Sequence, residues 1–218
     1  MVKQGFLNLT KEEQDRIIDA ALDEFAEKDF EPASLNNIIS RVGISKGSMY
    51  YYFTNKEDLY FYLINKVLEA KEIFLKHALS RLGKPLEKMS FFESLEFLMA
   101  ASVDFAMQHN REQQLSVRLQ NMAEGPLKEK LFGDLVRAFE DYVMNMVDEA
   151  IKAGEIRDDF DRDFVIRILK FTLLHFIDIY PDFEKFMADG GSVLKAETLK
   201  LSAFLKKGLA KNTSLEEL

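Results

Sequence analysis

The chain has 218 residues, of which 47% are hydrophobic and 30% are charged, and its formal net charge is −8. This composition predicts one or two folded domains and excludes a disordered chain. Cysteine is absent, which excludes disulfides, thiolate metal ligands and cysteine nucleophiles. The N-terminus has no apolar signal region and no run of about 18 apolar residues occurs, so we expect a cytoplasmic protein with no membrane partner.

Apolar residues recur at helical spacing along almost the whole chain, which predicts an all-α protein. A first helix follows Thr10, which has capping-box spacing with Glu13. A short second helix begins at Ser34 and ends at Gly43, and a third begins at Ser45 after a tight turn. Longer helices are expected after the cap Asn55 and at Ser90–His109, Arg111–Ala123, Pro126–Ala153, Arg162–Tyr180 and Ser192–Lys211.

The segment Pro32–Lys56 contains no acidic residue, although the chain has 37 of them. Arg41, Lys46 and Lys56 leave this segment with three positive charges and no negative one. Binding to phosphates depends on such local charge more than on the sum over the chain. Chance, or a pair of buried helices, would explain the same pattern without any nucleic acid.

The third helix has two unlike faces when its residues are spaced at about 100°. Met49, Tyr52 and Phe53 fall on an apolar face, which would pack against the first two helices. The opposite face is small, polar and aromatic and holds Lys46, Gly47, Ser48, Tyr50 and Tyr51. A short helix, a glycine turn and a second short helix form the helix-turn-helix pattern, whose second helix enters the DNA major groove.

Three helices begin inside the acid-free segment, at Ser34, Ser45 and Asn55. These side chains are expected to cap the helices, and the first-turn N–H groups can also bind phosphate. Lys56 has two interpretations, as a phosphate contact or as an ordinary solvated lysine.

The stretch SLNNIISRVGISKGSMYYYFTNKEDLYFYLI resembles the helix-turn-helix of TetR-family transcriptional regulators. The resemblance covers roughly residues 10–65. A departure is Ala33-Ser34, which stands where the family often has two threonines. The matching positions are Ser45, Lys46, Gly47, Ser48, Met49, Tyr50, Tyr51, Tyr52, Phe53, Asn55, Lys56, Glu57 and Leu59.

The resemblance implies an all-α fold with an N-terminal three-helix DNA-binding domain, residues 1–54. A long helix would join it to a helical effector-binding and dimerisation domain, residues 55–218. The implied function is a homodimeric, ligand-responsive repressor that a small apolar effector releases from a palindromic double-stranded DNA operator. The helices at Arg162–Tyr180 and Ser192–Lys211 would pair with those of a second copy. The implied DNA-binding residues are Ser34, Ser45, Lys46, Gly47, Ser48, Tyr50, Tyr51 and Lys56.

No motif for enzymatic chemistry accompanies this pattern, so no catalytic residue, cofactor or metal is expected. His77, His109 and His175 lack the spacing of metal ligands. Phenylalanines and methionines between Phe91 and Met107 suggest the lining of an apolar cavity. The alternative function is a helical ligand-binding protein or enzyme that has lost DNA binding.

Overall fold

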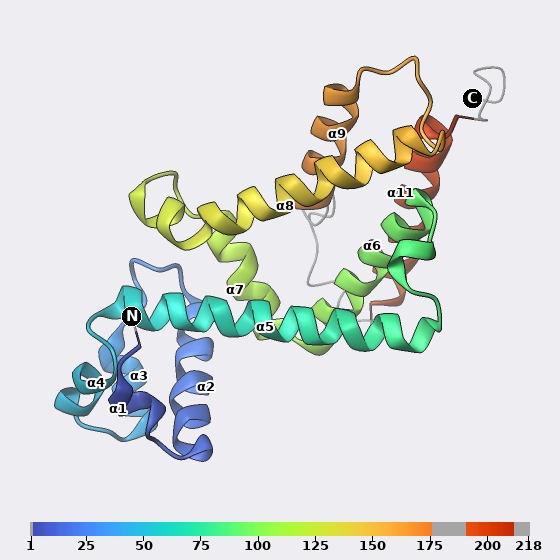
Figure 1. Cartoon of the computed structure of the whole chain (residues 1–218). Helices are drawn as coiled ribbons and strands as arrows, with labels where there is room; N and C mark the ends of the chain where they lie inside the picture. Colours follow the sequence, from blue (N-terminus) through green and yellow to red (C-terminus); the bar gives the residue numbers. More distant parts are fainter. Residues whose placement is uncertain (1, 176–190, 212–218) are drawn as a thin grey trace. The chain divides into compact units, whose positions relative to one another are not determined.

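The computed structural model describes residues 2–175 and 191–211, and every regular element in these ranges is a helix (Figure 1). The prediction of an all-α protein is confirmed. The elements are α1 (Gln4–Leu7), α2 (Lys11–Glu27), α3 (Leu35–Val42), α4 (Lys46–Tyr52), α5 (Lys56–Leu82), η1 (Leu86–Lys88), α6 (Phe91–Gln108), α7 (Asn110–Gln120), α8 (Pro126–Lys152), α9 (Arg162–Leu174) and α11 (Ser192–Leu209).

The predicted helix boundaries agree with these elements to within a few residues, with three exceptions. One is the short 3-10 helix η1, which was not predicted. The short helix α1 was not predicted, because four residues are too few to show a period. The predicted segment Arg162–Tyr180 is helical as far as Leu174, and its residues 176–180 lie outside the described residues.

The chain packs as two compact units. Unit 1 is Met1–Phe74 with His109–Gly133, and unit 2 is Leu75–Gln108 with Asp134–Leu218. Helices α5 and α8 each contribute residues to both units. The expected domain boundary between residues 54 and 55 separates DNA binding from effector binding and dimerisation. The packing of the chain does not test which residues carry these functions, so this boundary remains a prediction.

In unit 1, local sequence signals set where the helices begin and end. Thr10 and Glu13 form the predicted capping box at the start of α2, with hydrogen bonds of 3.3 Å and 2.9 Å. Gly43 ends α3 in the left-handed conformation, with φ 76°, which a side chain would disfavour. Arg16 of α2 donates to the Val42 carbonyl at 2.7 Å, so a second helix also satisfies the end of α3.

The core of unit 1 is built mainly from aromatic and aliphatic side chains of α2 and α5, with further side chains from α3 and α7 and Met49 from α4. Phe25 and Phe30 meet the ring of Tyr60 edge-on, with centroids 4.8 Å and 5.1 Å away. Met49 and Phe53 are fully buried in the same cluster. Because α4 buries this side, its opposite side is presented to solvent.

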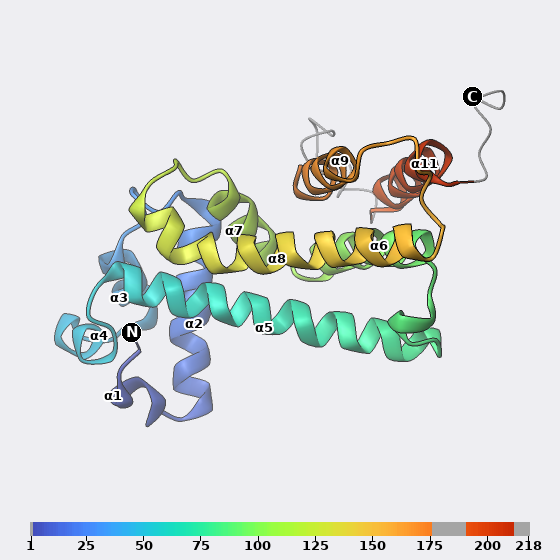
Figure 2. The same cartoon turned by 45° about the horizontal axis from the view of Figure 1, so that its top comes forward.

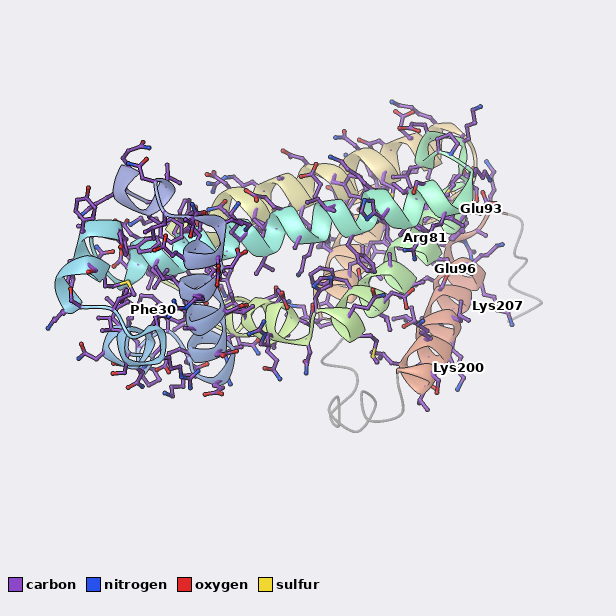
Figure 3. The ribbon with its side chains drawn as sticks, turned by 90° about the horizontal axis from the view of Figure 1, so that it is seen from below. Phe30, Arg81, Glu93, Glu96, Lys200 and Lys207 are labelled. Atoms are coloured by element: carbon purple, nitrogen blue, oxygen red, sulfur yellow. The ribbon has the colours of Figure 1, made fainter. Side chains whose placement is uncertain are left out.

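Unit 2 is a second helical core, in which α11 packs along α6 and α9 packs on α8 (Figure 2). Figure 3 shows α6, marked by Glu93 and Glu96, beside α11, marked by Lys200 and Lys207. The loop after α8 is fastened to the end of α11, since the N–H of Arg157 donates to the Leu209 carbonyl at 2.8 Å. Within the described parts of the chain, no helix has the length and hydropathy needed to cross a membrane.

Candidate nucleic-acid interface

Helix α4 has the two faces that its sequence predicts. Met49 is buried, and Tyr52 is half-buried with its ring edge-on to Phe6 at 6.2 Å. On the other side Tyr50 and Tyr51 are 42% and 65% exposed. Lys46 and Gly47 are also exposed and Ser48 is partly so, so the small, polar and aromatic surface faces solvent.

The first turn of α4 is held by its own serines. The Ser45 hydroxyl accepts from the Ser48 N–H at 3.0 Å, and the two hydroxyls lie 2.9 Å apart. This confirms Ser45 as a cap. Asn55 likewise caps α5, where its side-chain oxygen accepts from the Asp58 N–H at 2.8 Å. Helix α4 begins at Lys46 and Gly47, and a phosphate is favoured at such a helix start.

The three cations of the acid-free segment have different surroundings. Arg41 lies 3.7 Å from Asp23 and 3.5 Å from Glu27, two carboxylates of α2, which offset much of its charge. Lys46 has no carboxylate partner in the part of the chain that the structure describes, and its ammonium lies 6.0 Å from the Tyr50 ring centre. Lys46 is therefore the cation of this segment that is available to a phosphate.

The ammonium of Lys56 is not free in solvent, because groups of the protein itself already bind it. Its ammonium donates to the backbone carbonyls of Phe30, Glu31 and Ala33 at 2.6 Å, 2.9 Å and 3.1 Å. The Lys56 ammonium also lies 4.4 Å from the centre of the ring of Phe30, which is labelled in Figure 3. These contacts compete with a phosphate for the ammonium. The main role of Lys56 is therefore to brace the segment that connects α2 to α3, which it does by binding the carbonyls of that segment.

The expectation that the Ser34 side chain caps α3 is wrong. Ser34 occupies the N-cap position, but its hydroxyl makes no capping hydrogen bond. The buried carboxylate of Glu24 accepts instead from the Ser34 N–H at 2.9 Å and from the Asn37 amide at 3.0 Å. A carboxylate from α2 thus accepts hydrogen bonds at the start of α3, where the Ser34 hydroxyl was expected to do so.

Glu24 is ionised in this position although it is fully buried. Burial favours the neutral carboxyl, but hydrogen bonds from Lys28, the Ser34 N–H and Asn37 outweigh it and hold the pKa of Glu24 below its ordinary value. One of its oxygens, Oε2, is buried without a hydrogen-bond partner among the described residues. The charge of Glu24 therefore stabilises the contact between α2 and the start of α3.

Sequence reasoning missed the contribution of the N-terminal turn to this surface. The Lys3 ammonium donates to the Tyr50 carbonyl at 2.8 Å, which brings a cation to the C-terminal end of α4. Phe6 is buried beside Phe53, with ring centroids 4.9 Å apart. The apolar residue Phe6 shortly before the cap Thr10 was the signal available in the sequence.

The described residues contain no group of three or more metal-ligating side chains. Phe91 and Met99, which were expected beside an apolar cavity, are buried in the core of unit 2. The candidate site of this chain is therefore the exposed side of α4. A short helix, a left-handed glycine turn and a second helix with this exposed side define a helix-turn-helix DNA-binding protein.

Comparisons with known proteins agree with this class. Residues 17–63 match the family model described as bacterial regulatory proteins, tetR family. The chain is 25% identical over 148 residues to the fatty acid metabolism regulator protein of Bacillus subtilis, covering 67% of this chain and 72% of that protein. The chain is a transcriptional regulator of the TetR family, as its helix-turn-helix residues implied.

Solved structures show the same fold over most of the chain. A TetR family transcriptional regulator from Chloroflexus aurantiacus superposes with a TM-score of 0.74 at 27% identity, covering 97% of this chain and 100% of that one. The transcriptional regulator FadR from Bacillus subtilis, solved in complex with stearoyl-CoA, superposes with a TM-score of 0.68 at 20% identity. That match covers 89% of this chain and 98% of FadR.

Proposed function

We propose that this regulator is a homodimeric repressor that binds a palindromic operator through α4 and is released by an apolar small molecule. DNA binding is supported by the exposed side of α4, which presents Lys46, Gly47 and Tyr51 and no acidic residue. The bare backbone at Gly47 permits close approach to DNA, while the ammonium and hydroxyl groups can contact phosphates and base edges. Ser34, Ser45, Ser48 and Tyr50 complete the proposed contact residues. Lys56, which the resemblance also implied, is proposed instead to hold three backbone carbonyls.

The proposed dimer forms through the outward sides of α9 and α11. Phe164, Ile168 and Phe171 follow one stripe of α9, and Phe171 is 65% exposed in the single chain. On α11, Leu199 and Phe204 are 50% and 71% exposed. Large apolar side chains grouped in this way are typical of protein–protein interfaces. The full proposed interface is Arg162–Tyr180 with Ser192–Lys211.

The proposed effector is a small molecule with a large apolar part, bound by residues 55–218. A long-chain acyl-coenzyme A, whose acyl chain is apolar and whose coenzyme A part is charged, is the first candidate. The relative from Bacillus subtilis is named for fatty acid metabolism, and a protein of the same fold was solved with stearoyl-CoA. Effector and operator would favour two different states of the dimer, which is the coupling that release requires. We propose a cytoplasmic regulator with no enzymatic activity.

DNA binding with site preference is the decisive test. Fragments of the genome that encodes the protein are selected by the purified full chain at low salt, and bound sites are read by footprinting. We expect near-palindromic sites whose half-sites lie about 34–36 Å apart, or a multiple of that spacing. If no fragment is preferred, the alternative of a helical ligand-binding protein or enzyme without DNA binding is favoured.

Release is tested on the selected operator. Stearoyl-CoA is titrated into the protein–operator complex, with coenzyme A alone and free stearate as controls. Release by stearoyl-CoA but not by coenzyme A supports an apolar effector, and release by free stearate as well shifts the proposal to the acyl chain itself. An operator complex that none of the three affects contradicts this effector class while leaving DNA binding intact.

A further inference from the structure

The N-terminal turn is fastened to the end of the proposed recognition helix. The N–H of Lys3 donates to the Tyr52 carbonyl at 3.0 Å, and its ammonium donates to the Tyr50 carbonyl at 2.8 Å. Phe6 anchors the same turn in the core, with its ring centroid 4.9 Å from that of Phe53. Because α1 is held at both of these points, its backbone has a fixed position beside α4.

Gly5 lies in this turn directly against the ring of Tyr51. A β-carbon added at Gly5 would lie 2.2 Å from Cε1 and 2.7 Å from Cδ1 of that ring. Real β-carbons do not approach other atoms so closely, so the ring occupies space that any other residue at position 5 would fill. The phenol of Tyr51 therefore lies on bare backbone, while 65% of the residue stays exposed.

The backbone of Gly5 gives no other reason for a glycine. Its φ is not among the positive ones of the chain, which are found at Gly43, Gly83, Gly154 and Gly191. Alanine in a helix is more favourable than glycine by about 1 kcal/mol. Nothing about the local fold thus requires glycine at position 5, whereas the position of the Tyr51 ring does.

An exposed tyrosine without such support samples several rotamers, and DNA binding must then select one of them. Fixing a side chain beforehand removes that entropic cost from the binding step. The second neighbour of the Tyr51 ring is Tyr52, whose centroid lies 5.8 Å away. Gly5 and Tyr52 together leave the outer side of the ring free for a ligand.

We propose that Gly5 is a positioning residue for Tyr51: the bare backbone of α1 sets the direction in which the tyrosine meets DNA. This inference rests on the proposed function of α4. It adds the N-terminal turn to the DNA-binding surface as a support that acts through Tyr51 and need not itself touch the nucleic acid.

The test compares Gly5→Ala, Tyr51→Ala and the double variant in operator titrations with the full chain. Gly5→Ala displaces the ring and weakens operator binding about 3-fold to 10-fold, with a melting temperature that does not fall, since alanine is more favourable than glycine in a helix. In the Tyr51→Ala background the added methyl group meets no ring, so the second change has no further effect. Gly125→Ala is the matched control, because a β-carbon there meets nothing within 4 Å.

Two results of the operator titrations overturn the inference: wild-type affinity in Gly5→Ala, or full additivity of the two changes. NMR gives a reading that does not depend on DNA, since nuclear Overhauser effects between the Gly5 α-protons and the Tyr51 ring are expected in the wild-type protein. Their absence overturns the inference as well. If these effects are present but the wild-type protein shows no site preference for DNA, the proposed function fails and the contact remains a structural one.

Discussion

The ammonium of Lys56 donates to the backbone carbonyl of Phe30 at 2.6 Å and lies 4.4 Å from the centre of the same residue's ring. The start of α5 is thereby tied to the segment between α2 and α3. One lysine satisfies three carbonyls in this segment, and none of the three belongs to a regular helix.

Lys56→Ala is expected to lower the free energy of unfolding by about 1–3 kcal/mol, because partly buried carbonyls lose a charged donor. Chemical denaturation measures this, and Lys66→Ala on the same helix is the control, since Lys66 pairs with Glu69 at the surface. If stability is unchanged while the salt dependence of DNA binding falls, Lys56 is a phosphate contact instead of a brace.

Lys46→Ala is expected to weaken operator binding and to reduce the slope of log K against log salt by about one unit, the value for one lost phosphate contact. The melting temperature should not change, because the side chain is exposed and has no carboxylate partner among the described residues. Lys152→Ala removes one exposed lysine from α8 and should leave the slope as it is. An unchanged slope in Lys46→Ala would show that this lysine contacts no phosphate.

Arg118→Ala is expected to destabilise unit 1 by about 2 kcal/mol. Its guanidinium donates to the carbonyls of Ala26 and Glu27 at 2.7 Å and 2.8 Å, which satisfies the C-terminal end of α2, and it pairs with Asp29 at 2.8 Å. Thermal and urea unfolding measure the loss.

Arg111→Ala on the same helix is the matched comparison for Arg118→Ala. Among the described residues, Arg111 pairs only with the side chains of Asp19 and Asp23, at the surface. Such pairs contribute about 0–1 kcal/mol. Equal losses in the two variants would mean that the carbonyl contacts of Arg118 contribute nothing beyond an ordinary surface pair.

Glu24→Gln is expected to destabilise the protein by about 1–3 kcal/mol at pH 7, since a neutral amide replaces a carboxylate that accepts from three donors. The pKa of Glu24 is lowered in the folded state, so its stabilisation is present above the ordinary value of 4.5 and disappears as the pH falls through the folded value. The difference from wild type should therefore shrink below pH 4.5.

Unfolding experiments between pH 3 and pH 7, on the order of one step per pH unit, measure this difference. Glu12→Gln replaces an exposed glutamate of the same helix and should change stability by less than about 0.5 kcal/mol. A loss in Glu24→Gln that does not depend on pH would assign the effect to shape instead of charge.

Phe204→Glu is expected to convert the proposed dimer to monomers, because it places a charge in an apolar interface. Analytical ultracentrifugation at micromolar concentration gives the mass, and circular dichroism shows whether the helices remain. Ile73→Glu alters a side chain of similar exposure on α5 and should leave the mass unchanged. A dimeric Phe204→Glu, or a monomeric wild type, would contradict the proposed interface.

The sequence alone predicted those features of the fold that depend on neighbours within about one helical turn. Thr10 and Glu13, Gly43, Ser45 and Asn55 each set a helix end through atoms three to five residues away, and the structure has them in these roles. The two faces of α4 follow from helical periodicity in the same way. This is why Met49 is buried and Tyr51 is exposed as expected.

Contacts between distant segments decided the rest, because no local pattern records which carbonyl or carboxylate will fold against a given side chain. Glu24 meets the Ser34 N–H across ten residues, Lys56 meets the Phe30 carbonyl across 26, and Lys3 meets the Tyr50 carbonyl across 47. The sequence by itself determined an all-helical protein with a DNA-binding helix pair. Only the tertiary structure decided which of its cations remain available to a phosphate, since that depends on what has already folded against each of them.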